Sequence, residues 1–336
     1  MRTITLIPGD GIGIEVTKSV QKVIKATRVP IDWEIINGGE TAFNATGEYM
    51  PQSLIDSITK NKIAFKGPLT TPIGTGFKSI NVALRKKFHT YANVRPVKNM
   101  PNIKTPFDNV DLVIIRENSE DLYCGIEHMV ADGVAESIKV ITRKASLEIG
   151  EYAFKYARDH GRKKVTAVHK ANIMKISDGL FLECIRSIAE KYPEIQYEEV
   201  IVDNMCMQLV MYPEKYDVLV LPNLYGDIVS DLAAGLVGGL GLIPSANIGH
   251  GVAIFEAVHG SAPQIAGKNM ANPIACILSA AMMLDYINEK PAADLIREGV
   301  NFILEEGIYI TGDIGGSATT EELTNALCNY IEKRIP

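Results

Sequence analysis

Short apolar runs rich in β-branched residues alternate along the chain with longer amphipathic stretches, and this alternation narrows the possible folds more than any other feature. Seven runs predict β-strands, at 3–7, 33–36, 63–65, 112–115, 165–168, 218–221 and 253–255. Apolar residues at three- and four-residue intervals predict helices at 14–26, 147–157, 179–191, 273–288, 293–305 and 320–333. Strands that alternate with helices indicate an α/β fold.

Two local patterns refine this interpretation. The segment Pro8-Gly-Asp-Gly-Ile-Gly13 opens the first helix, but it reads G-x-G-x-G where a dinucleotide-binding turn requires G-x-G-x-x-G. We therefore interpret it as a tight turn and not as a Rossmann cradle.

Between Tyr123 and Arg143, short alternating pieces surround Asp132-Gly133, which is typical of a hairpin. We expect a two-stranded arm there, of the kind that joins subunits.

The composition excludes several classes of protein. At 336 residues the chain is long enough for two domains. A formal net charge of -6 with scattered Lys and Arg argues against nucleic-acid binding. The run 232–243 is too short and too rich in Gly to span a bilayer, and residues 1–8 lack the apolar segment of a secretory signal. We expect neither a nucleic acid nor a membrane as partner.

The five cysteines are odd in number, far apart and embedded in apolar sequence. This pattern favours buried reduced thiols over a disulfide framework. Reduced thiols imply a reducing compartment, and we expect a cytoplasmic protein. The residues are Cys124, Cys184, Cys206, Cys276 and Cys328.

Two aspartates, Asp227 and Asp231, lie four residues apart in an apolar segment, where a helix would place both on one face. The pair either marks a helix N-terminus, where the dipole favours Asp, or holds a cation. A third carboxylate, Asp203, follows the strand-like run 196–202. Three carboxylates without Cys or His at ligand spacing favour Mg²⁺ or Mn²⁺ over zinc.

Polar and basic residues suited to an acidic substrate follow a Gly- and Thr-rich loop at 67–76. Ser79 is a candidate helix cap, and Asn81 and Arg85 can meet on one helix face. Arg85 alone would fit an ordinary surface helix better, but Arg95 and Arg116 also lie at the ends of predicted elements. Because arginine pairs with carboxylates through two parallel hydrogen bonds, three of them suit a substrate with several acid groups.

Three further segments carry candidate residues. Tyr123 follows Arg116 by seven residues, although a lone Tyr is more often a packing residue. Lys170 falls just past the strand at 165–168, where βα loops commonly carry active groups, although a surface Lys is the ordinary alternative. The Gly- and Pro-containing segment from His259 to Asn272 precedes a helix and suits the adenine end of a nucleotide.

Taken together, these motifs resemble the metal-dependent β-decarboxylating dehydrogenases, the family of isocitrate, isopropylmalate and homoisocitrate dehydrogenases. The match runs nearly end to end, from Pro8-Gly-Asp-Gly-Ile-Gly13 through Arg116-Glu-Asn-Ser-Glu120 to Gly315-Gly-Ser-Ala-Thr-Thr320. Ser79 and Asn81 resemble the isocitrate type, because isopropylmalate enzymes place apolar residues there. The resemblance implies oxidative decarboxylation of isocitrate to 2-oxoglutarate and CO₂, with hydride transfer to NAD.

The resemblance also implies roles for individual residues. Ser79 and Asn81 would contact the carboxylate that distinguishes isocitrate, while Lys170 would take the hydroxyl proton and Tyr123 would protonate carbon. The other carboxylates would be held by Arg85, Arg95 and Arg116, and Mg²⁺ or Mn²⁺ by Asp203, Asp227 and Asp231. The cofactor would lie against Thr71, Asn172, His259, Gln264, Ile265 and Asn272.

The implied architecture is a two-domain α/β fold of the isocitrate/isopropylmalate dehydrogenase type, not a classical Rossmann fold. Residues 1–98 and 240–336 would form a large domain on the cofactor side. Residues 99–239 would form a small domain with the metal site, the dimer interface and an arm at about 123–143. Lys170 and Asp203 would reach in from a partner subunit, so we expect a homodimer or higher homo-oligomer with shared active sites.

Cofactor and substrate leave alternatives open. NADP-linked bacterial relatives have Lys-Tyr where this chain has Gln264-Ile265, which favours NAD, but NAD-linked relatives usually have Asp in place of Gln264. Homoisocitrate or another 3-substituted malate is an alternative substrate. A non-catalytic regulatory subunit is a third possibility, although Tyr123, Lys170 and the three aspartates are all present here.

Overall fold

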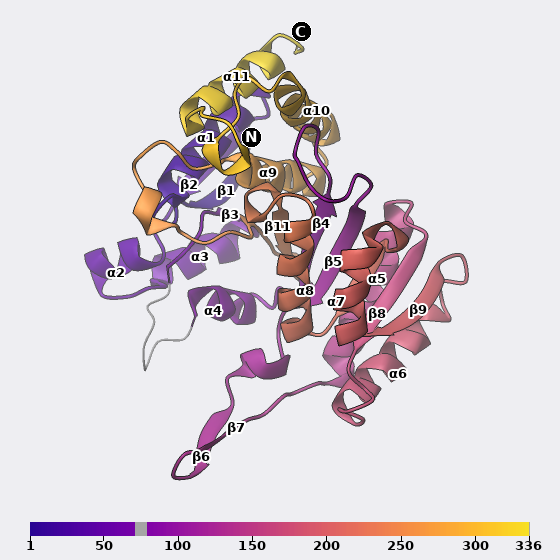
Figure 1. The fold of residues 1–336 in the computed structure, drawn as a ribbon. Helices are drawn as coiled ribbons and strands as arrows, with labels where there is room; N and C mark the ends of the chain where they lie inside the picture. Colours follow the sequence, from indigo (N-terminus) through magenta and orange to yellow (C-terminus); the bar gives the residue numbers. More distant parts are fainter. Residues whose placement is uncertain (71–78, 336) are drawn as a thin grey trace.

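The computed structural model describes residues 1–70 and 79–335. Its strands include β1 (Arg2–Ile7), β2 (Ile31–Ile35), β3 (Ile63–Lys66), β4 (Ala92–Lys98), β5 (Asp111–Glu117), β8 (Lys164–His169), β9 (Gln196–Ile201), β10 (Val218–Leu221), β11 (Pro244–Ile248) and β12 (Ala253–Ala257). They form one ten-stranded sheet in the order β2-β1-β3-β12-β11-β4-β5-β10-β8-β9 (Figure 1). β4 and β11 are antiparallel to both of their neighbours, and the other neighbouring pairs are parallel. Strand direction therefore reverses at the centre of the sheet.

Helices cover both faces of each half of this sheet and complete three layers. Beside β1, β3 and β12, one face carries α1 (Gly13–Ala26), α9 (Ile274–Tyr286), α10 (Lys290–Glu306) and α11 (Thr320–Glu332). The opposite face carries α3 (Gln52–Asn61) and α4 (Ile80–Lys87), with α2 (Glu40–Thr46) nearby. Beside β5, β8 and β10, the two faces are covered by α5 (Arg143–Asp159) with α6 (Ser177–Ala189), and by α7 (Val202–Met211) with α8 (Asn223–Leu236).

Local sequence explains where several helices lie. Between Ile274 and Leu284, every residue of α9 except Met282 is buried, as expected for a helix that is apolar on all sides. α11 begins with a capping box, in which Thr319 accepts from the backbone N–H of Glu322 and the Glu322 carboxylate accepts from that of Thr319.

The predicted α/β class is confirmed, and each predicted strand and helix exists with its ends shifted by a few residues. Among the described strands and α-helices, β4, β11, α2, α3 and α7 were not predicted. β4 and β11 were missed because Asn93, Arg95 and Asn247 interrupt their apolar pattern. These three residues belong to a network of buried polar side chains at the centre of the sheet.

The glycine-rich turn before α1 packs against neighbouring loops. A Cβ on Gly9 would clash with the carbonyl oxygen of Pro68, and one on Gly11 would clash with that of Ser261. The amides of Asp10 and Ile12 donate to these same two carbonyls. Since these two amides are used within the protein, they are not available to a pyrophosphate, and the turn serves to pack the loops together.

The predicted arm is present. β6 (Glu127–Ala131) and β7 (Val134–Ser137) pair antiparallel around Asp132-Gly133 and extend away from the rest of the chain (Figure 1). Its apolar side chains, including Met129, Val130 and Val134, are exposed. A two-stranded hairpin that exposes apolar side chains and has no core of its own is marginally stable in water, so we expect a partner to cover it.

Two other expectations concern membranes and thiols. In the part of the chain that the structure describes, no helix combines the length and apolar character needed to cross a bilayer. All five cysteines are free, with Cys184 and Cys276 buried and the other three partly buried.

Candidate active site

Polar side chains form a row across five neighbouring strands at the centre of the sheet, where strand direction reverses. The pairing register places Glu256 opposite both Lys66 and Ser245, and Asn93 opposite both Asn247 and Arg116. All of these side chains are buried. Because buried polar groups require partners, this row is a connected network.

Glu256 is the anionic centre of one end of this row. Its carboxylate contacts the Lys66 ammonium, lies 3.4 Å from Nη2 of Arg85, and accepts a 2.7 Å hydrogen bond from Nδ2 of Asn247. Burial alone would raise the pKa of Glu256, but Lys66 and Arg85 outweigh it and lower the pKa to about 2. Glu256 therefore stays ionised and fixes the position of Arg85.

Replacing Glu256 with Gln is expected to destabilise the protein by about 3–5 kcal/mol, since it leaves Lys66 buried without its counter-ion. The pKa of Glu256 is depressed, so its stabilisation is present above the pKa of an unfolded carboxyl and is lost as the pH falls toward 2. Urea unfolding at several pH values measures both effects. The double variant Glu256→Gln/Lys66→Met should recover part of the loss, and equal stability of wild type and E256Q would contradict the expectation.

Arg95 and Arg116 lie at the other end of the row, on β4 and β5. Arg95 donates from Nε to Asn93 Oδ1 at 2.7 Å and from Nη1 to Ser230 Oγ at 2.5 Å. Arg116 donates from Nε and Nη2 to Asn223 Oδ1 at 3.1 and 2.8 Å. Burial and the charges of Arg116 and Arg85 lower the pKa of Arg95 to about 10. Three crowded cations therefore favour an anionic ligand beside them.

Asp227 and Asp231 face these arginines from α8. Asp227 contacts Nη1 of Arg116 and lies 3.6 Å from Nη2 of Arg95, while Asp231 lies 3.3 Å from Nη1 of Arg95. α8 begins at Asn223, so Asp227 lies beyond the first turn and the helix-N-terminus interpretation does not hold. Both side chains keep part of their surface open to solvent, at 37% and 56%. Their carboxylates share one face, as predicted.

The two aspartates differ in charge state and neighbours. Burial opposes ionisation of Asp227, but Arg116, the Tyr123 hydroxyl and Arg95 hold its pKa below the usual value. Burial and the charge of Asp227 raise the pKa of Asp231, against the effect of Arg95. Tyr123 donates to Asp227 Oδ2 at 2.5 Å, and burial together with this hydrogen bond raises the pKa of Tyr123. Tyr123 thus keeps its proton at neutral pH.

Asn81 and Arg85 line a small cavity of about 110 Å³ together with Arg95 and His259. Asn81 Oδ1 and Arg85 Nε are buried and have no hydrogen-bond partner among the described residues. An unpaired buried acceptor and an unpaired buried donor are costly, and a polar ligand in the cavity would satisfy both. Ser79 occupies the N-cap position of α4, but its side chain makes no capping hydrogen bond, so that expectation is wrong.

Lys170 and Asp203 form a separate pair. Lys170 Nζ lies 2.7 Å from Asp203 Oδ1, and Lys170 holds the pKa of this carboxyl below its usual value. Within the described chain, Asp203, Asp227 and Asp231 do not bring three ligand atoms within 4.8 Å of one another. One chain therefore assembles only two of the three predicted metal ligands.

The residues predicted for cofactor binding lie in several loops. His259 lines the cavity beside Asn81 and Arg85, and burial lowers its pKa. Gln264 is exposed and Ile265 half-buried on a short helix, Pro263–Ile265. Asn272 donates to Asp313 Oδ2 at 3.0 Å, and Asn172 is exposed in the turn after β8, away from these loops in sequence. Thr71 lies outside the described residues.

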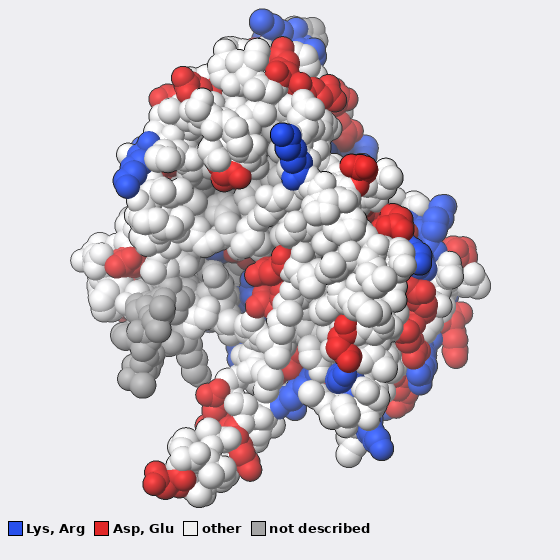
Figure 2. All heavy atoms as spheres, viewed as in Figure 1, with Lys and Arg blue, Asp and Glu red and all other residues white. Residues whose placement is uncertain are grey.

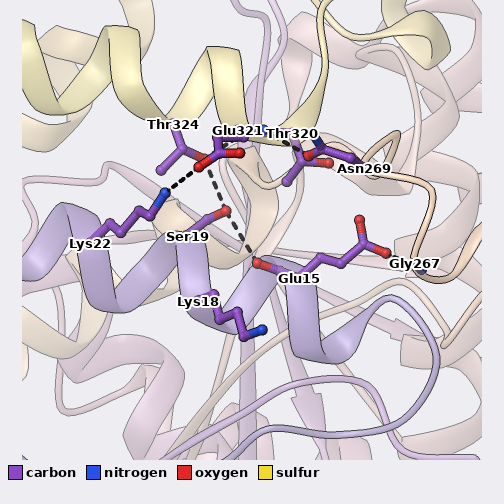
Figure 3. A pocket seen from close by; sticks show the side chains of 9 residues that line it. All are labelled: Glu15, Lys18, Ser19, Lys22, Gly267, Asn269, Thr320, Glu321 and Thr324. Atoms are coloured by element: carbon purple, nitrogen blue, oxygen red, sulfur yellow. Dashed lines mark hydrogen bonds and ion pairs between the residues drawn. The ribbon is translucent and has the colours of Figure 1, made fainter.

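A different hollow, of about 310 Å³, lies between α1 and α11 (Figure 3). A salt bridge of 2.8 Å between Lys22 and Glu321 closes one side of it. The predicted site residues do not line it.

The charges on the surface are mixed. Figure 2 shows acidic and basic side chains interspersed over one face of the molecule, and both signs also occur beside a separate depression near the centre of that face.

Sequence reasoning missed the residues that hold the arginines. Lys66 and Glu256 position Arg85, and Asn223 accepts from Arg116. One signal was available, because a charged residue at the end of an otherwise apolar strand must find a partner when buried. The identity of that partner depends on strand order.

Comparison with known proteins gives consistent results. Residues 3–327 match the family model described as isocitrate/isopropylmalate dehydrogenase. The chain is 55% identical over 330 residues to isocitrate dehydrogenase [NAD] catalytic subunit 5 of Arabidopsis thaliana, covering 98% of this chain and 88% of the relative. It is 53% identical over 337 residues to one of the isocitrate dehydrogenase [NAD] regulatory subunits of Dictyostelium discoideum, covering 100% and 93%. The solved isocitrate dehydrogenase of Methylococcus capsulatus superposes with a TM-score of 0.96 at 50% identity, covering 99% and 100%.

Two expectations are affected by these names. Both sequence relatives are described as mitochondrial, which does not support the expected cytoplasmic location. One is named as a catalytic subunit and the other as a regulatory subunit, so these relatives do not confirm the expected homo-oligomer.

Proposed function

Because the chain belongs to the isocitrate/isopropylmalate dehydrogenase family, we propose that it catalyses the oxidative decarboxylation of isocitrate to 2-oxoglutarate and CO₂ with NAD. The observation that carries the proposal is that Asn81 Oδ1 and Arg85 Nε are buried without a hydrogen-bond partner among residues 1–70 and 79–335, and that both residues line a cavity together with Arg95. A buried site with three guanidinium groups nearby and unsatisfied polar atoms suits a compact polyanion.

Substrate binding follows from the charges. Arg85, Arg95 and Arg116 approach the site from α4, β4 and β5, and their side chains are immobilised by Glu256, Asn93 and Asn223. Fixed donors lose little conformational freedom when they bind carboxylates, so a tricarboxylate gains both affinity and a defined orientation.

The donor set also fits a divalent cation. Asp227 and Asp231 offer oxygen ligands on one helix face, and Asp227 is ionised. Mg²⁺ or Mn²⁺ bound there would supply charge stabilisation for the developing alkoxide and enolate. NAD would accept the hydride.

The chain's own groups account for the two proton transfers. Lys170, acting as the neutral amine, would take the hydroxyl proton as hydride leaves the same carbon, which gives a β-keto acid. Loss of CO₂ leaves a carbanion equivalent, and the Tyr123 hydroxyl donates the proton to carbon. The raised pKa of Tyr123 keeps that proton in place until it is needed.

Completion of the site by a partner subunit is part of the proposal. α7 carries Asp203 in its first turn and exposes Met207, Val210 and Met211. A partner that covers this apolar surface would bring Lys170 and Asp203 close to a neighbouring chain. The domain division at 98/99 and 239/240 is proposed on the same family resemblance.

NAD as cofactor is supported by charge. NADP-linked bacterial relatives have a Lys-Tyr pair for the 2′-phosphate, and the two residues that stand at those positions here, Gln264 and Ile265, carry no charge. Arg297 lies later in the sequence, and its guanidinium already pairs with Asp285 and Asp294, so it is not free to bind a phosphate.

Steady-state turnover of isocitrate, homoisocitrate and isopropylmalate, each with NAD and with NADP, tests the proposal in the presence of Mg²⁺. The highest kcat/KM is expected for isocitrate with NAD. Higher kcat/KM for another pair would identify that pair as the physiological one. The absence of turnover with all six pairs would favour a regulatory role, the one named for the relative from Dictyostelium discoideum.

Substituting Asn81 with Ala is expected to lower kcat/KM for isocitrate by about 10²-fold, because the hydrogen bonds to a substrate carboxylate are lost. Ser79→Ala should give a smaller loss in the same direction. Isopropylmalate carries an alkyl group at this point, so its kcat/KM should fall little or rise. Equal losses for both substrates would contradict a role in substrate selection.

A further inference from the structure

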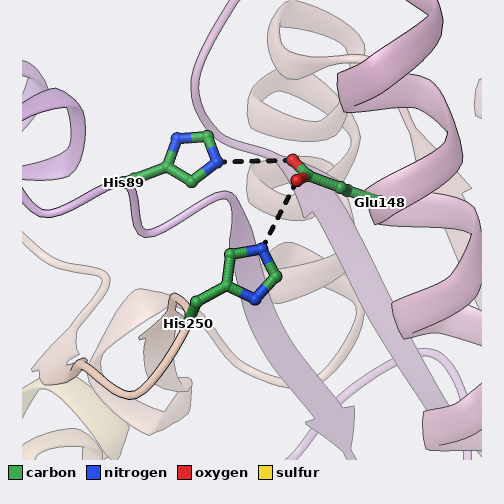
Figure 4. A group of neighbouring side chains, drawn as sticks. All are labelled: His89, Glu148 and His250. Atoms are coloured by element: carbon green, nitrogen blue, oxygen red, sulfur yellow. Dashed lines mark hydrogen bonds and ion pairs between the residues drawn. The ribbon is translucent and has the colours of Figure 1, made fainter.

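A second group of metal-ligating side chains lies apart from the aspartates. His89, Glu148 and His250 each offer one ligand atom, and these atoms all lie within 4.8 Å of one another. Figure 4 shows the two imidazoles directed at the Glu148 carboxylate. His89 Nε2 lies 3.3 Å from Oε2, and His250 Nε2 lies 3.4 Å from Oε1.

Three segments far apart in sequence bring these side chains together. His89 lies between α4 and β4, His250 lies in the turn between β11 and β12, and Glu148 projects from α5. The backbone of His89 has a φ of +47°, which residues with side chains rarely adopt. Gly249 passes so close that a Cβ there would lie 2.7 Å from the His89 carbonyl oxygen. This close packing joins the two histidine-bearing loops.

One aromatic ring, that of Tyr91, packs beside both imidazoles. The Tyr91 ring lies 4.9 Å from the His250 ring and 5.9 Å from the His89 ring, measured between centroids. The outer side stays open, because the side chains of His89 and His250 are 45% and 66% exposed. The cluster therefore combines fixed ligands with access from solvent.

We propose that His89, Glu148 and His250 form a binding site for Zn²⁺ or a chemically similar transition-metal ion. Two imidazoles and one carboxylate are a common zinc ligand set, whereas Mg²⁺ prefers oxygen ligands. With bonds of about 2.0–2.1 Å, tetrahedral ligand atoms lie about 3.4 Å apart. Each imidazole nitrogen already lies at about this distance from one of the two carboxylate oxygens, His89 from Oε2 and His250 from Oε1, and one ligand atom from each residue lies within 4.8 Å of the others. The open side leaves a fourth position for water.

An ion at this site would crosslink two parts of the fold. α5 packs against β5, β8 and β10, while the two histidines belong to loops at the ends of β4 and β11–β12. The ion would replace two hydrogen bonds with metal–ligand bonds and tie α5 to these loops. Because it binds the folded chain in preference to the unfolded chain, we expect Zn²⁺ to raise the melting temperature.

Zinc binding to untagged protein carrying Asp227→Asn tests the proposal, because this background weakens the separate carboxylate site. Competition with a chromogenic chelator should give one Zn²⁺ per chain, and the melting temperature should rise. Replacing a residue that only hydrogen-bonds to a metal ligand already lowers metal affinity by about 10- to 100-fold. Because His250→Gln and His89→Gln each remove a direct ligand, either should weaken Zn²⁺ binding by at least about 100-fold. Co²⁺ in place of Zn²⁺ should show the visible absorption of a tetrahedral site.

His128→Gln is the matched control, since His128 also pairs with a carboxylate, Glu136, at 3.5 Å and is 49% exposed. This variant should bind Zn²⁺ like its parent. The proposal is overturned if His250→Gln and His89→Gln retain the parent's affinity and melting-temperature rise. It is equally overturned if no Zn²⁺ binds in the Asp227→Asn background.

Discussion

Replacing Asp227 with Asn is expected to reduce kcat/KM for isocitrate by about 10³-fold or more, equivalent to about 4 kcal/mol of transition-state stabilisation. Asn keeps the shape of the side chain but removes the charge that faces Arg116, Arg95 and the proposed cation. The oxygen ligand becomes neutral, Arg116 loses its counter-ion, and Arg95 loses one of its two carboxylate neighbours. Steady-state kinetics across a Mn²⁺ titration measure the effect.

Asp111→Asn is a suitable control for that experiment. Asp111 is also paired with an arginine, Arg162, at 2.6 Å, and its side chain is 41% exposed against 37% for Asp227. It lies outside the proposed site, so its replacement should leave kcat/KM within about twofold, as for ordinary surface substitutions. If D227N kept wild-type turnover, or if the wild type worked fully in the presence of a strong chelator, the metal-dependent mechanism would be refuted.

The second large effect concerns the shared active site. Lys170→Met is expected to lower kcat by about 10³-fold or more, because Met cannot accept the hydroxyl proton. A hybrid of one K170M chain and one D227N chain should nevertheless be active. The K170M chain supplies an intact Asp227, its D227N partner supplies an intact Lys170, and one of the two sites is therefore complete.

Two different affinity tags isolate the hybrid from the parent dimers. About half of the wild-type turnover per dimer is expected, since one of two equivalent sites is restored. If each site were built within a single chain, the hybrid would be as inactive as both parents, and the proposed contribution of Lys170 and Asp203 from a partner would be wrong. Lys175→Met, which replaces an exposed lysine of the same loop, should leave turnover unchanged.

Some features of the site were predictable because they depend on spacing along one element. Asp227 and Asp231 lie four residues apart, and a helix necessarily places them on one face. Asn81 and Arg85 follow the same rule on α4. The arm was predictable because the Asp-Gly turn and its flanking runs are neighbours in sequence.

Other features depend on contacts between distant segments. Lys66 meets Glu256 because β3 pairs with β12, and Asn93 faces Arg116 because β4 pairs with β5. Ser79 was expected to cap a helix from its position alone, but its side chain does not do so. The relation of Lys170 and Asp203 to the other site residues also stays a prediction, since it involves a second chain.

The sequence by itself determined the α/β class, the arm and the faces of single helices, because hydrophobic periodicity and residue spacing act over a few turns. Only the tertiary structure decided which polar residues meet in the central strands and that His89, Glu148 and His250 form one cluster. The physical reason is that strand order and register, fixed by packing of the whole core, decide which distant side chains share one face.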